Sequence, residues 1–191
     1  MKTTMKIRYK HQRFQAEATK CVSDVFQGQP KHDGSRTFLN KFGALDFDGF
    51  GNLPLVLDNE SICENVRGVQ MAEGLRPVEH LEGDGRTFTV EMETGTGKTY
   101  TYIKTMYELN ACYGWSKFVI VVPSIAIREG VYKSFESMAE HFAEEYGKRM
   151  QYFVYNSKQL AKIDAFASDN GIHAMIINTQ AFNASLNEDK N

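Results

Sequence analysis

Residues 90–100 read VEMETGTGKTY, and this stretch decides the fold class. Gly95 and Gly97 allow successive backbone amides to turn inward and cradle phosphate oxygens, which larger side chains would obstruct. Lys98 and Thr99 complete the end of the phosphate-loop pattern G-x-x-x-x-G-K-[ST]. We expect the lysine ammonium to contact the β and γ phosphates of a nucleotide and the threonine hydroxyl to bind Mg²⁺.

The flanking residues support this interpretation. Residues 87–92 (TFTVEM) alternate in hydrophobicity and predict a strand, and residues 98–110 have helical spacing. Met92 stands where the strict pattern has its first glycine. A glycine-rich turn with a chance lysine is the alternative, but the strand-to-helix context favours ATP or GTP binding.

The composition is that of a globular protein with one domain. The chain has 191 residues, of which 42% are hydrophobic and 24% charged, and no apolar run long enough for a membrane helix. The formal charge of -2 means that contacts to nucleic acid must come from locally placed cations and amides. Cys21, Cys63 and Cys112 are too scattered for a metal site or a disulfide framework, so we expect reduced thiols and a cytoplasmic protein.

Strands and helices alternate after the loop, which predicts an α/β fold with a mostly parallel sheet and helices on both faces. Ligands of such folds bind at the carboxyl ends of the strands. We expect the apolar run FVIVV to lie near the centre of the sheet. The predicted strands are 118–122, 151–155 and 174–178, and the predicted helices are about 126–145 and 158–167.

The first 86 residues are less regular. Residues 12–26 predict a helix, and residues 31–86 predict an irregular elaboration of the nucleotide domain. Asp58 ends the apolar run LPLVL and imitates a Mg²⁺ carboxylate, but it precedes the glycine-rich loop and follows a proline. We therefore expect three parts, 1–30, 31–86 and 87–191.

Polar residues follow two of the predicted strands. Ser124 and Arg128 come after FVIVV, and Thr179 and Gln180 come after AMIIN. These side chains could contact the backbone phosphates of a nucleic acid, or they could cap and solvate the helices that follow. Their placement at the same sheet edge favours the first interpretation.

Phe14 and Gln15 open the first predicted helix. A glutamine amide offers a donor and an acceptor side by side, which matches the N6 and N7 edge of adenine, and the phenylalanine ring could pack nearby. The simpler interpretation is an exposed helix residue.

Together these stretches resemble superfamily 2 helicases, and more closely the helicase-translocase (Res) subunit of type III restriction-modification enzymes. METGTGKTY at 92–100, YGWSKFVIVVPSIAIREG at 113–130 and RFQ at 13–15 are similar to that family's first motifs, in order. The resemblance covers about residues 8–30 and 50–185. It implies that Met92 is the residue that this subfamily uses in place of the opening glycine.

The resemblance implies a RecA-like domain that binds ATP and Mg²⁺, acts on duplex DNA and works with a methyltransferase (Mod) subunit. DNA cleavage would take place in another domain of the parent protein. Ser124, Arg128, Thr179 and Gln180 would touch the DNA backbone, and Lys98 and Thr99 would be the catalytic residues. The implied nucleotide-binding residues are Phe14, Gln15, Thr94, Gly95, Thr96, Gly97, Lys98, Thr99 and Tyr100.

The resemblance to the family ends at about residue 185. Family members carry an Asp-Glu-x-His motif on the next strand, a second RecA-like domain with an arginine finger, and an endonuclease domain, and we find none of these here. We therefore expect an N-terminal fragment that binds nucleotide weakly and turns over little of it. Another superfamily 2 DNA helicase and a phosphate-loop small-molecule kinase remain as alternatives.

Overall fold

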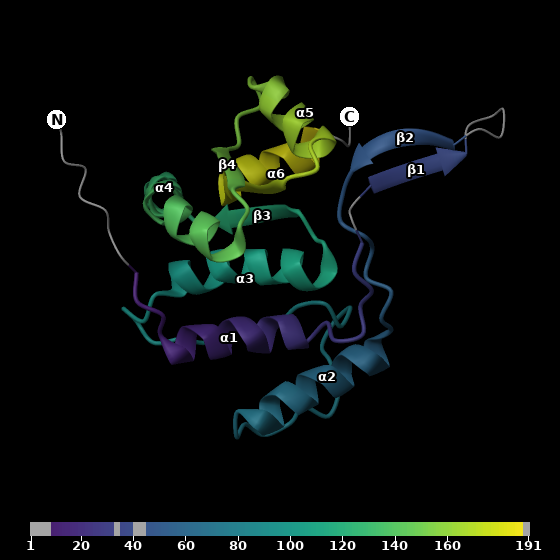
Figure 1. The fold of residues 1–191 in the computed structure, drawn as a ribbon, viewed down its shortest axis with the longest axis vertical. Helices are drawn as coiled ribbons and strands as arrows, with labels where there is room; N and C mark the ends of the chain where they lie inside the picture. The colour runs from purple at the N-terminus through teal and green to yellow at the C-terminus, as the bar shows by residue number, and fades with distance from the viewer. Residues whose placement is uncertain (1–8, 33–34, 40–44, 189–191) are drawn as a thin grey trace. The chain divides into compact units, whose positions relative to one another are not determined.

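A computed structural model describes residues 9–32, 35–39 and 45–188 of the chain (Figure 1). The described part forms helices and strands, which alternate from residue 98 onward. In chain order they are α1 (Arg13–Asp24), β1 (Ser35–Leu39), β2 (Leu45–Phe50), α2 (Asn59–Ala72), α3 (Lys98–Tyr113), β3 (Lys117–Val122), α4 (Ile125–Tyr146), β4 (Met150–Val154), α5 (Leu160–Ser168), β5 (Ile172–Asn178) and α6 (Thr179–Glu188).

Contacts within the chain group its residues into two compact units. The loop unit comprises His11–His32 and Leu53–Gly114, and it contains the glycine-rich loop. The sheet unit comprises Met1–Lys10, Asp33–Asn52 and Trp115–Asn191. The division into 1–30, 31–86 and 87–191 stays a prediction.

The sheet unit contains a parallel sheet in the order β3-β5-β4. Val122 pairs with Asn178 across β3 and β5, so the ends of these two strands lie level with each other. The predicted α/β class with a parallel sheet is confirmed. The expectation that FVIVV lies at the centre is wrong, because β5 holds that place and β3 pairs only with β5 among the described strands. Val119 and Val121 of β3 are also nearly half exposed.

Helix α4 packs against β4 and β5, and α6 contacts β5 and β3. The apolar face of α4 recurs at helical spacing, which explains why this segment forms a helix that covers a sheet. Its buried members are Val131, Phe135, Met138 and Phe142. The helix ends at Gly147, whose φ of 65° is the left-handed conformation that favours glycine.

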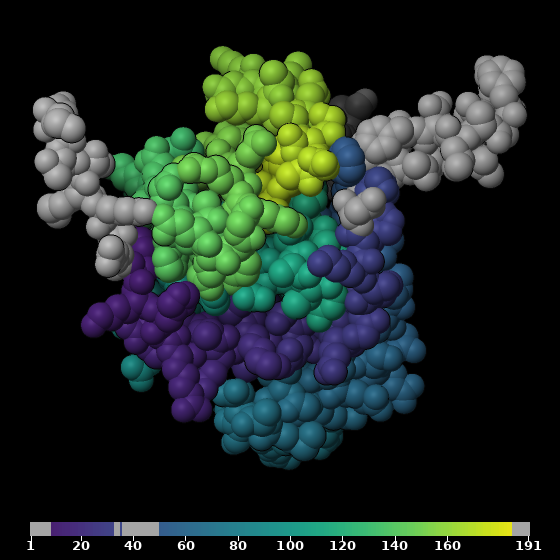
Figure 2. All heavy atoms as spheres, viewed as in Figure 1, coloured from purple at the N-terminus to yellow at the C-terminus, as the bar shows by residue number. Residues whose placement is uncertain are grey.

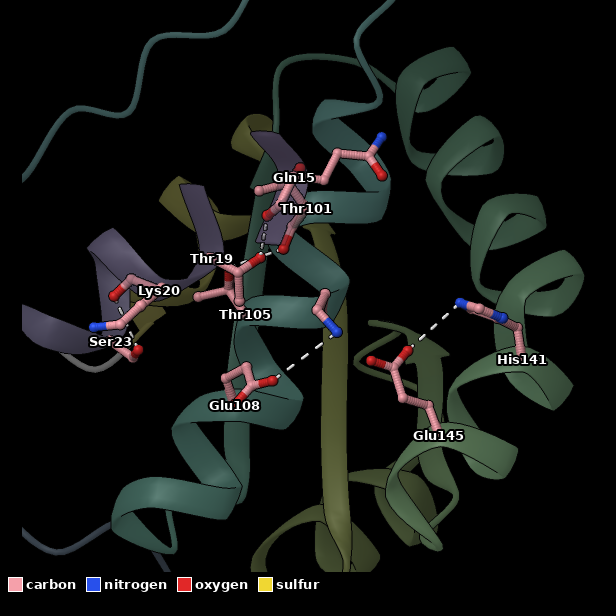
Figure 3. Close-up of polar contacts among 10 residues, drawn as sticks. Gln15, Thr19, Lys20, Ser23, Thr101, Thr105, Glu108, His141 and Glu145 are labelled. Carbon is pink, nitrogen blue, oxygen red and sulfur yellow. Dashed lines mark hydrogen bonds and ion pairs between the residues drawn. The ribbon is translucent and has the colours of Figure 1, made fainter. Parts of the chain in front are cut away.

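In the loop unit, α1 packs along α3 and also contacts α2. The side chains of α1 and α2 adjoin in the space-filling view (Figure 2). Figure 3 shows Thr19 of α1 beside Thr101 and Thr105 of α3, and all three are buried. Their short side chains allow the two helices to pack closely. The Tyr113 hydroxyl donates a hydrogen bond of 2.8 Å to the Ser23 carbonyl and joins the other ends of the two helices.

Helix α2 lies in the stretch 31–86 that we expected to be irregular, so that expectation is wrong for residues 59–72. The Asp58 carboxylate accepts a hydrogen bond of 2.8 Å from the Ser61 amide and caps the helix. Ile62 and Cys63 are buried on its inner face. In the sheet unit, β1 and β2 pair antiparallel, which also adds regular structure to this stretch.

The predicted strand at 87–92 is absent, and these residues form no regular structure. Alternating hydrophobicity is not sufficient for a strand, because the backbone also needs a neighbouring strand with free hydrogen-bonding groups. Residues 87–92 belong to the loop unit, whereas the parallel strands belong to the sheet unit. Val90 accordingly remains 52% exposed. No helix in the described part of the chain is both long and apolar enough to cross a membrane.

Candidate functional site

The glycine-rich loop has the backbone that its sequence predicts. Gly95 and Gly97 have φ values of 82° and 89°, in the left-handed region where other residues are strained. Gly97 is also the N-cap of α3, so the loop leads directly into the amino end of a 16-residue helix. The amino end of a helix carries unpaired N–H groups and a partial positive charge, and both favour an anion.

Three donors of the loop converge on one acceptor, the Glu93 carbonyl. The Lys98 ammonium and the Thr96 hydroxyl each lie 2.7 Å from this oxygen, and the Thr96 amide lies 3.4 Å away. The loop can therefore direct an ammonium, a hydroxyl and an amide at a single oxygen atom. Phosphate oxygens offer the same kind of acceptor with more negative charge.

The loop offers few protein atoms that could bind a metal ion. Thr99 lies in the first turn of α3 and is partly buried. Within the described ranges, no three His, Cys, Asp or Glu side chains gather in a group that could hold a metal ion. The residues fit a nucleotide-bound Mg²⁺, for which the phosphates supply most ligands and the threonine hydroxyl supplies one.

Gln15 lies against the loop. Its Nε2 donates a hydrogen bond of 2.8 Å to the Thr96 carbonyl, and the residue is 8% exposed. Phe14 is 46% exposed and lines a cavity of about 960 Å³ together with Glu93 and Thr96. The structure thus brings both predicted base-contact residues to the loop, and it places the phenyl ring where a flat ligand could reach it.

Tyr100 does not share this position. It is 5% exposed and belongs to the buried core of α3. The preceding residue, Thr99, is partly accessible. Successive side chains on an α-helix point about 100° apart, so the Tyr100 side chain points in a different direction from that of Thr99. The Tyr100 side chain is thus turned into the core, and the assignment of Tyr100 to nucleotide contact stays a prediction.

In the sheet unit, the polar residues predicted at the two strand ends do lie together. The Ser124 hydroxyl oxygen accepts a hydrogen bond of 3.3 Å from the Ile127 amide and caps α4. The Thr179 hydroxyl donates a hydrogen bond of 3.1 Å to the Val122 carbonyl at the end of β3. Both residues are exposed, as is Gln180. A capping serine still has its own proton to donate, so capping does not prevent contact with an external anion.

Arg128 connects the two strand ends. Its Nη1 lies 3.3 Å from Asn178 Oδ1, and its Nη2 lies 3.1 Å from Glu129 Oε1. The arginine side chain is 20% exposed, whereas that of Glu129 is 53% exposed. The guanidinium is thus held at the carboxyl edge of the sheet with part of its surface accessible.

A third strand end, which was not among the predicted site residues, contributes to the same edge. A cavity of about 540 Å³ is lined by Arg128 and by residues that follow β4. The relevant signal was the polar stretch NSKQ at 156–159, which comes directly after a predicted strand just as the other two clusters do. The polar residues that line the cavity from this side are Asn156, Ser157, Gln159 and Lys162.

Comparison with protein families matches residues 60–191 to the type III restriction enzyme, res subunit. The chain is 36% identical over 113 residues to the type III restriction-modification enzyme EcoP15I Res subunit of Escherichia coli. It is equally similar to the EcoPI Res subunit of Escherichia phage P1. The StyLTI Res subunit of Salmonella typhimurium is 38% identical over 125 residues.

These alignments cover 56% to 58% of the chain and 12% to 13% of the length of the relatives. The chain therefore spans about an eighth of the proteins that it matches. The aligned family region includes the glycine-rich loop and the polar ends of β3, β4 and β5. Because the family match extends over more than half of the sequence, the chain belongs to the res subunit family of type III restriction enzymes.

Proposed function

We propose that this chain is the ATP-binding, RecA-like part of a DNA translocase that serves a type III restriction enzyme. The observation that carries the proposal is the glycine-rich loop, whose donors converge on one oxygen, within a stretch that matches the res subunit family. Residues 94–99 would hold the phosphates of ATP. Lys98 would contact the β and γ phosphates, and Thr99 would bind Mg²⁺.

The base of the nucleotide would lie beside Phe14 and Gln15. The phenyl ring lines the cavity next to the loop, and the glutamine amide is already fixed to the loop backbone. Bound Mg²⁺ would neutralise charge on the phosphates. Every other contact proposed for the nucleotide comes from the residues of the loop unit.

The DNA backbone would lie along the carboxyl edge of the sheet. Ser124, Thr179 and Gln180 are exposed neutral donors there, and Arg128 supplies a positive charge. This set suits contacts to phosphates, which position a protein on DNA without reading its sequence. Because the formal charge of the chain is -2, the attraction would be local.

The activity proposed for a longer protein that contains this domain is based on the relatives, which are Res subunits of type III restriction-modification enzymes. In such a protein, ATP bound between this domain and a second RecA-like domain would change the grip on duplex DNA and move the protein along it. Cleavage would take place in a further domain, and a methyltransferase (Mod) subunit would be the partner. Residues 94–99 by themselves would bind ATP and turn it over slowly, because hydrolysis also needs a carboxylate to orient water and commonly an arginine from another domain.

The test combines two measurements on the purified chain. Binding of a fluorescent DNA duplex is followed by anisotropy, and formation of ADP from ATP is followed with either duplex DNA or a mixture of nucleosides and sugars. We expect duplex binding and little ADP formation under both conditions. Absence of duplex binding, or transfer of phosphate to a small metabolite, would overturn the proposal in favour of a small-molecule kinase.

A further inference from the structure

Resting on the proposed function, we infer that the cavity at the end of β4 binds an unstacked base of a DNA strand whose backbone lies along the carboxyl edge of the sheet. The cavity has a volume of about 540 Å³, and its lining comes from α4, from the residues after β4 and from the starts of α5 and α6 (Figure 1). All of these residues belong to the sheet unit. Pockets of this size hold small molecules, so one nucleotide fits in the cavity.

Two tyrosines in the lining offer aromatic surface for a base. Tyr132 comes one turn after Arg128 on α4, so the two side chains lie on the same face of the helix, and Tyr155 directly follows β4. The Tyr132 ring packs in a T-shaped arrangement on the ring of Tyr152, with the two centroids 5.4 Å apart. Tyr132 and Tyr155 are both half-buried, so part of each residue remains accessible to a ligand. Unpaired bases stack on tyrosine rings in proteins that bind single strands.

The charges in the lining suit the edge of a base better than a phosphate alone. Arg128 Nη2 lies 3.1 Å from Glu129 Oε1, so a carboxylate offsets the charge of the guanidinium beside the cavity. Lys162 supplies a second positive charge. The lining thus contains an anionic acceptor as well as donors. The edge of a base presents both donors and acceptors, whereas an ionised phosphate presents acceptors only.

Gln159 adds a side chain that can bond a base. It is the N-cap residue of α5, but its side chain makes no capping hydrogen bond. Its exposed amide therefore has both its donors and its oxygen available for a ligand in the cavity. Lys162 lies three positions later, on α5, and its exposed ammonium suits the phosphate of the same nucleotide.

Arg128 joins the cavity to the proposed DNA surface, because it lines the cavity and also bonds Asn178 at the end of β5. A strand whose phosphate contacts Arg128 would hold the attached base next to the cavity. In a duplex that base is paired and stacked, and it can enter a protein pocket only after it leaves the stack. The cavity would therefore take a base from a single strand and not from an intact duplex.

Oligothymidine and an abasic strand of the same length test this inference, because they share the sugar-phosphate backbone and differ only in the bases. Their affinities, and that of a DNA duplex, are measured by fluorescence anisotropy for the wild type, for Tyr132→Leu and for Tyr146→Leu. Tyr146 is the matched control, since it is also half-buried on α4 and lies about 21 Å further along that helix.

We expect the wild type to bind oligothymidine roughly 5- to 10-fold more tightly than the abasic strand, which corresponds to the stacking of one base. Tyr132→Leu should remove this difference and leave the affinities for the abasic strand and the duplex unchanged. Tyr146→Leu should behave like the wild type. An equal concentration of free thymidine monophosphate should not displace oligothymidine, because the free nucleotide lacks the neighbouring phosphates of a strand.

Equal affinities of the wild type for the two strands would overturn the inference, because the backbone alone would then account for binding. A folded Tyr132→Leu variant that keeps the preference for bases would overturn it as well, as would displacement by thymidine monophosphate. If Tyr132→Leu does not fold, Tyr155→Leu takes its place with the same expected result. Failure of the wild type to bind the duplex or either strand is a separate outcome, because it would overturn the proposed function itself.

Discussion

The Arg128 guanidinium lies 3.3 Å from the Asn178 amide oxygen, so a helix that follows β3 is joined to the last residue of β5. The two residues are 50 positions apart in the sequence. They meet because β3 and β5 are adjacent and parallel, with Val122 level with Asn178. This contact places a positive charge at the carboxyl edge of the sheet, where the proposed DNA surface lies.

Replacing Arg128 by alanine should weaken binding of a DNA duplex and lower the slope of log affinity against log salt by about 1, because one phosphate contact is lost. Arg149→Ala is the matched control. Arg149 comes just before β4, at the amino end of that strand. Its side chain is 68% exposed and forms an ion pair with Glu140. Titrations of each variant with a DNA duplex over a series of salt concentrations measure both slopes. Equal slopes for the two variants would mean that Arg128 makes no contact with a DNA phosphate.

The two loop glycines should respond differently to alanine. Both have positive φ, so each substitution carries a backbone cost of about 1–2 kcal/mol. A Cβ at Gly95 meets no atom within 4 Å, whereas one at Gly97 collides with Gln15 Nε2. We expect Gly97→Ala to reduce ATP affinity and thermal stability more than Gly95→Ala does.

A double variant isolates this collision. Removing the glutamine side chain in Gly97→Ala/Gln15→Ala should make the two substitutions less than additive in stability, since the clash is then absent. Strict additivity in a denaturation cycle would mean that Gln15 and Gly97 do not interact.

Two helix-ending glycines offer a test of the loop unit. Gly114 and Gly147 both end helices with φ values of 76° and 65°. A Cβ at Gly147 meets open space, but one at Gly114 collides with the backbone carbonyl of His32. Gly147→Ala should lower the free energy of unfolding by about 1–2 kcal/mol, and Gly114→Ala by more. Similar losses in urea denaturation would contradict the close approach of His32.

Tyr113 should make the free energy of unfolding decrease as the pH rises above 10. Burial raises its pKa from the usual 10 to about 12, so the folded state favours the protonated phenol. Its contribution to stability is therefore complete below pH 10 and is lost as the pH rises toward 12. Tyr113→Phe removes the hydrogen bond to Ser23 and should cost about 1 kcal/mol at pH 8.

The same variant should lose less stability than the wild type between pH 10 and 12, because the titrating group is gone. Unfolding free energies at pH 8, 10 and 12 measure the difference. A constant difference between the two proteins over this range would show that Tyr113 does not titrate as described.

The sequence could predict the parts of the site that depend on strand ends. A buried apolar run followed by a polar cluster indicates both a strand and its carboxyl end, and Ser124, Arg128 and Thr179 accordingly lie together. The sequence also predicted the phosphate loop, because the loop backbone needs positive φ angles at positions 95 and 97, and glycine adopts such angles without strain. The family followed from the same residues.

The structure differs from the other predictions for physical reasons that cannot be inferred from a single sequence. Residues 87–92 alternate like a strand, but pairing depends on a neighbour far away in the sequence. The order of the strands depends on tertiary packing, so FVIVV could not be placed at an edge from its hydrophobicity. Helix α2 was missed although Asp58 is a typical N-cap, because glycine and polar residues interrupt its apolar face.

Calorimetry of ATP binding in the presence of Mg²⁺, with the wild-type chain and with Lys98→Ala, is the most direct test of nucleotide binding by the glycine-rich loop. Lys133→Ala is the control, since it removes the same charge from an exposed position on α4. We predict that the wild type and Lys133→Ala bind ATP alike and that Lys98→Ala binds it at least about tenfold more weakly, because a charge-assisted contact to phosphate is lost. Equal affinities for all three proteins would contradict this prediction.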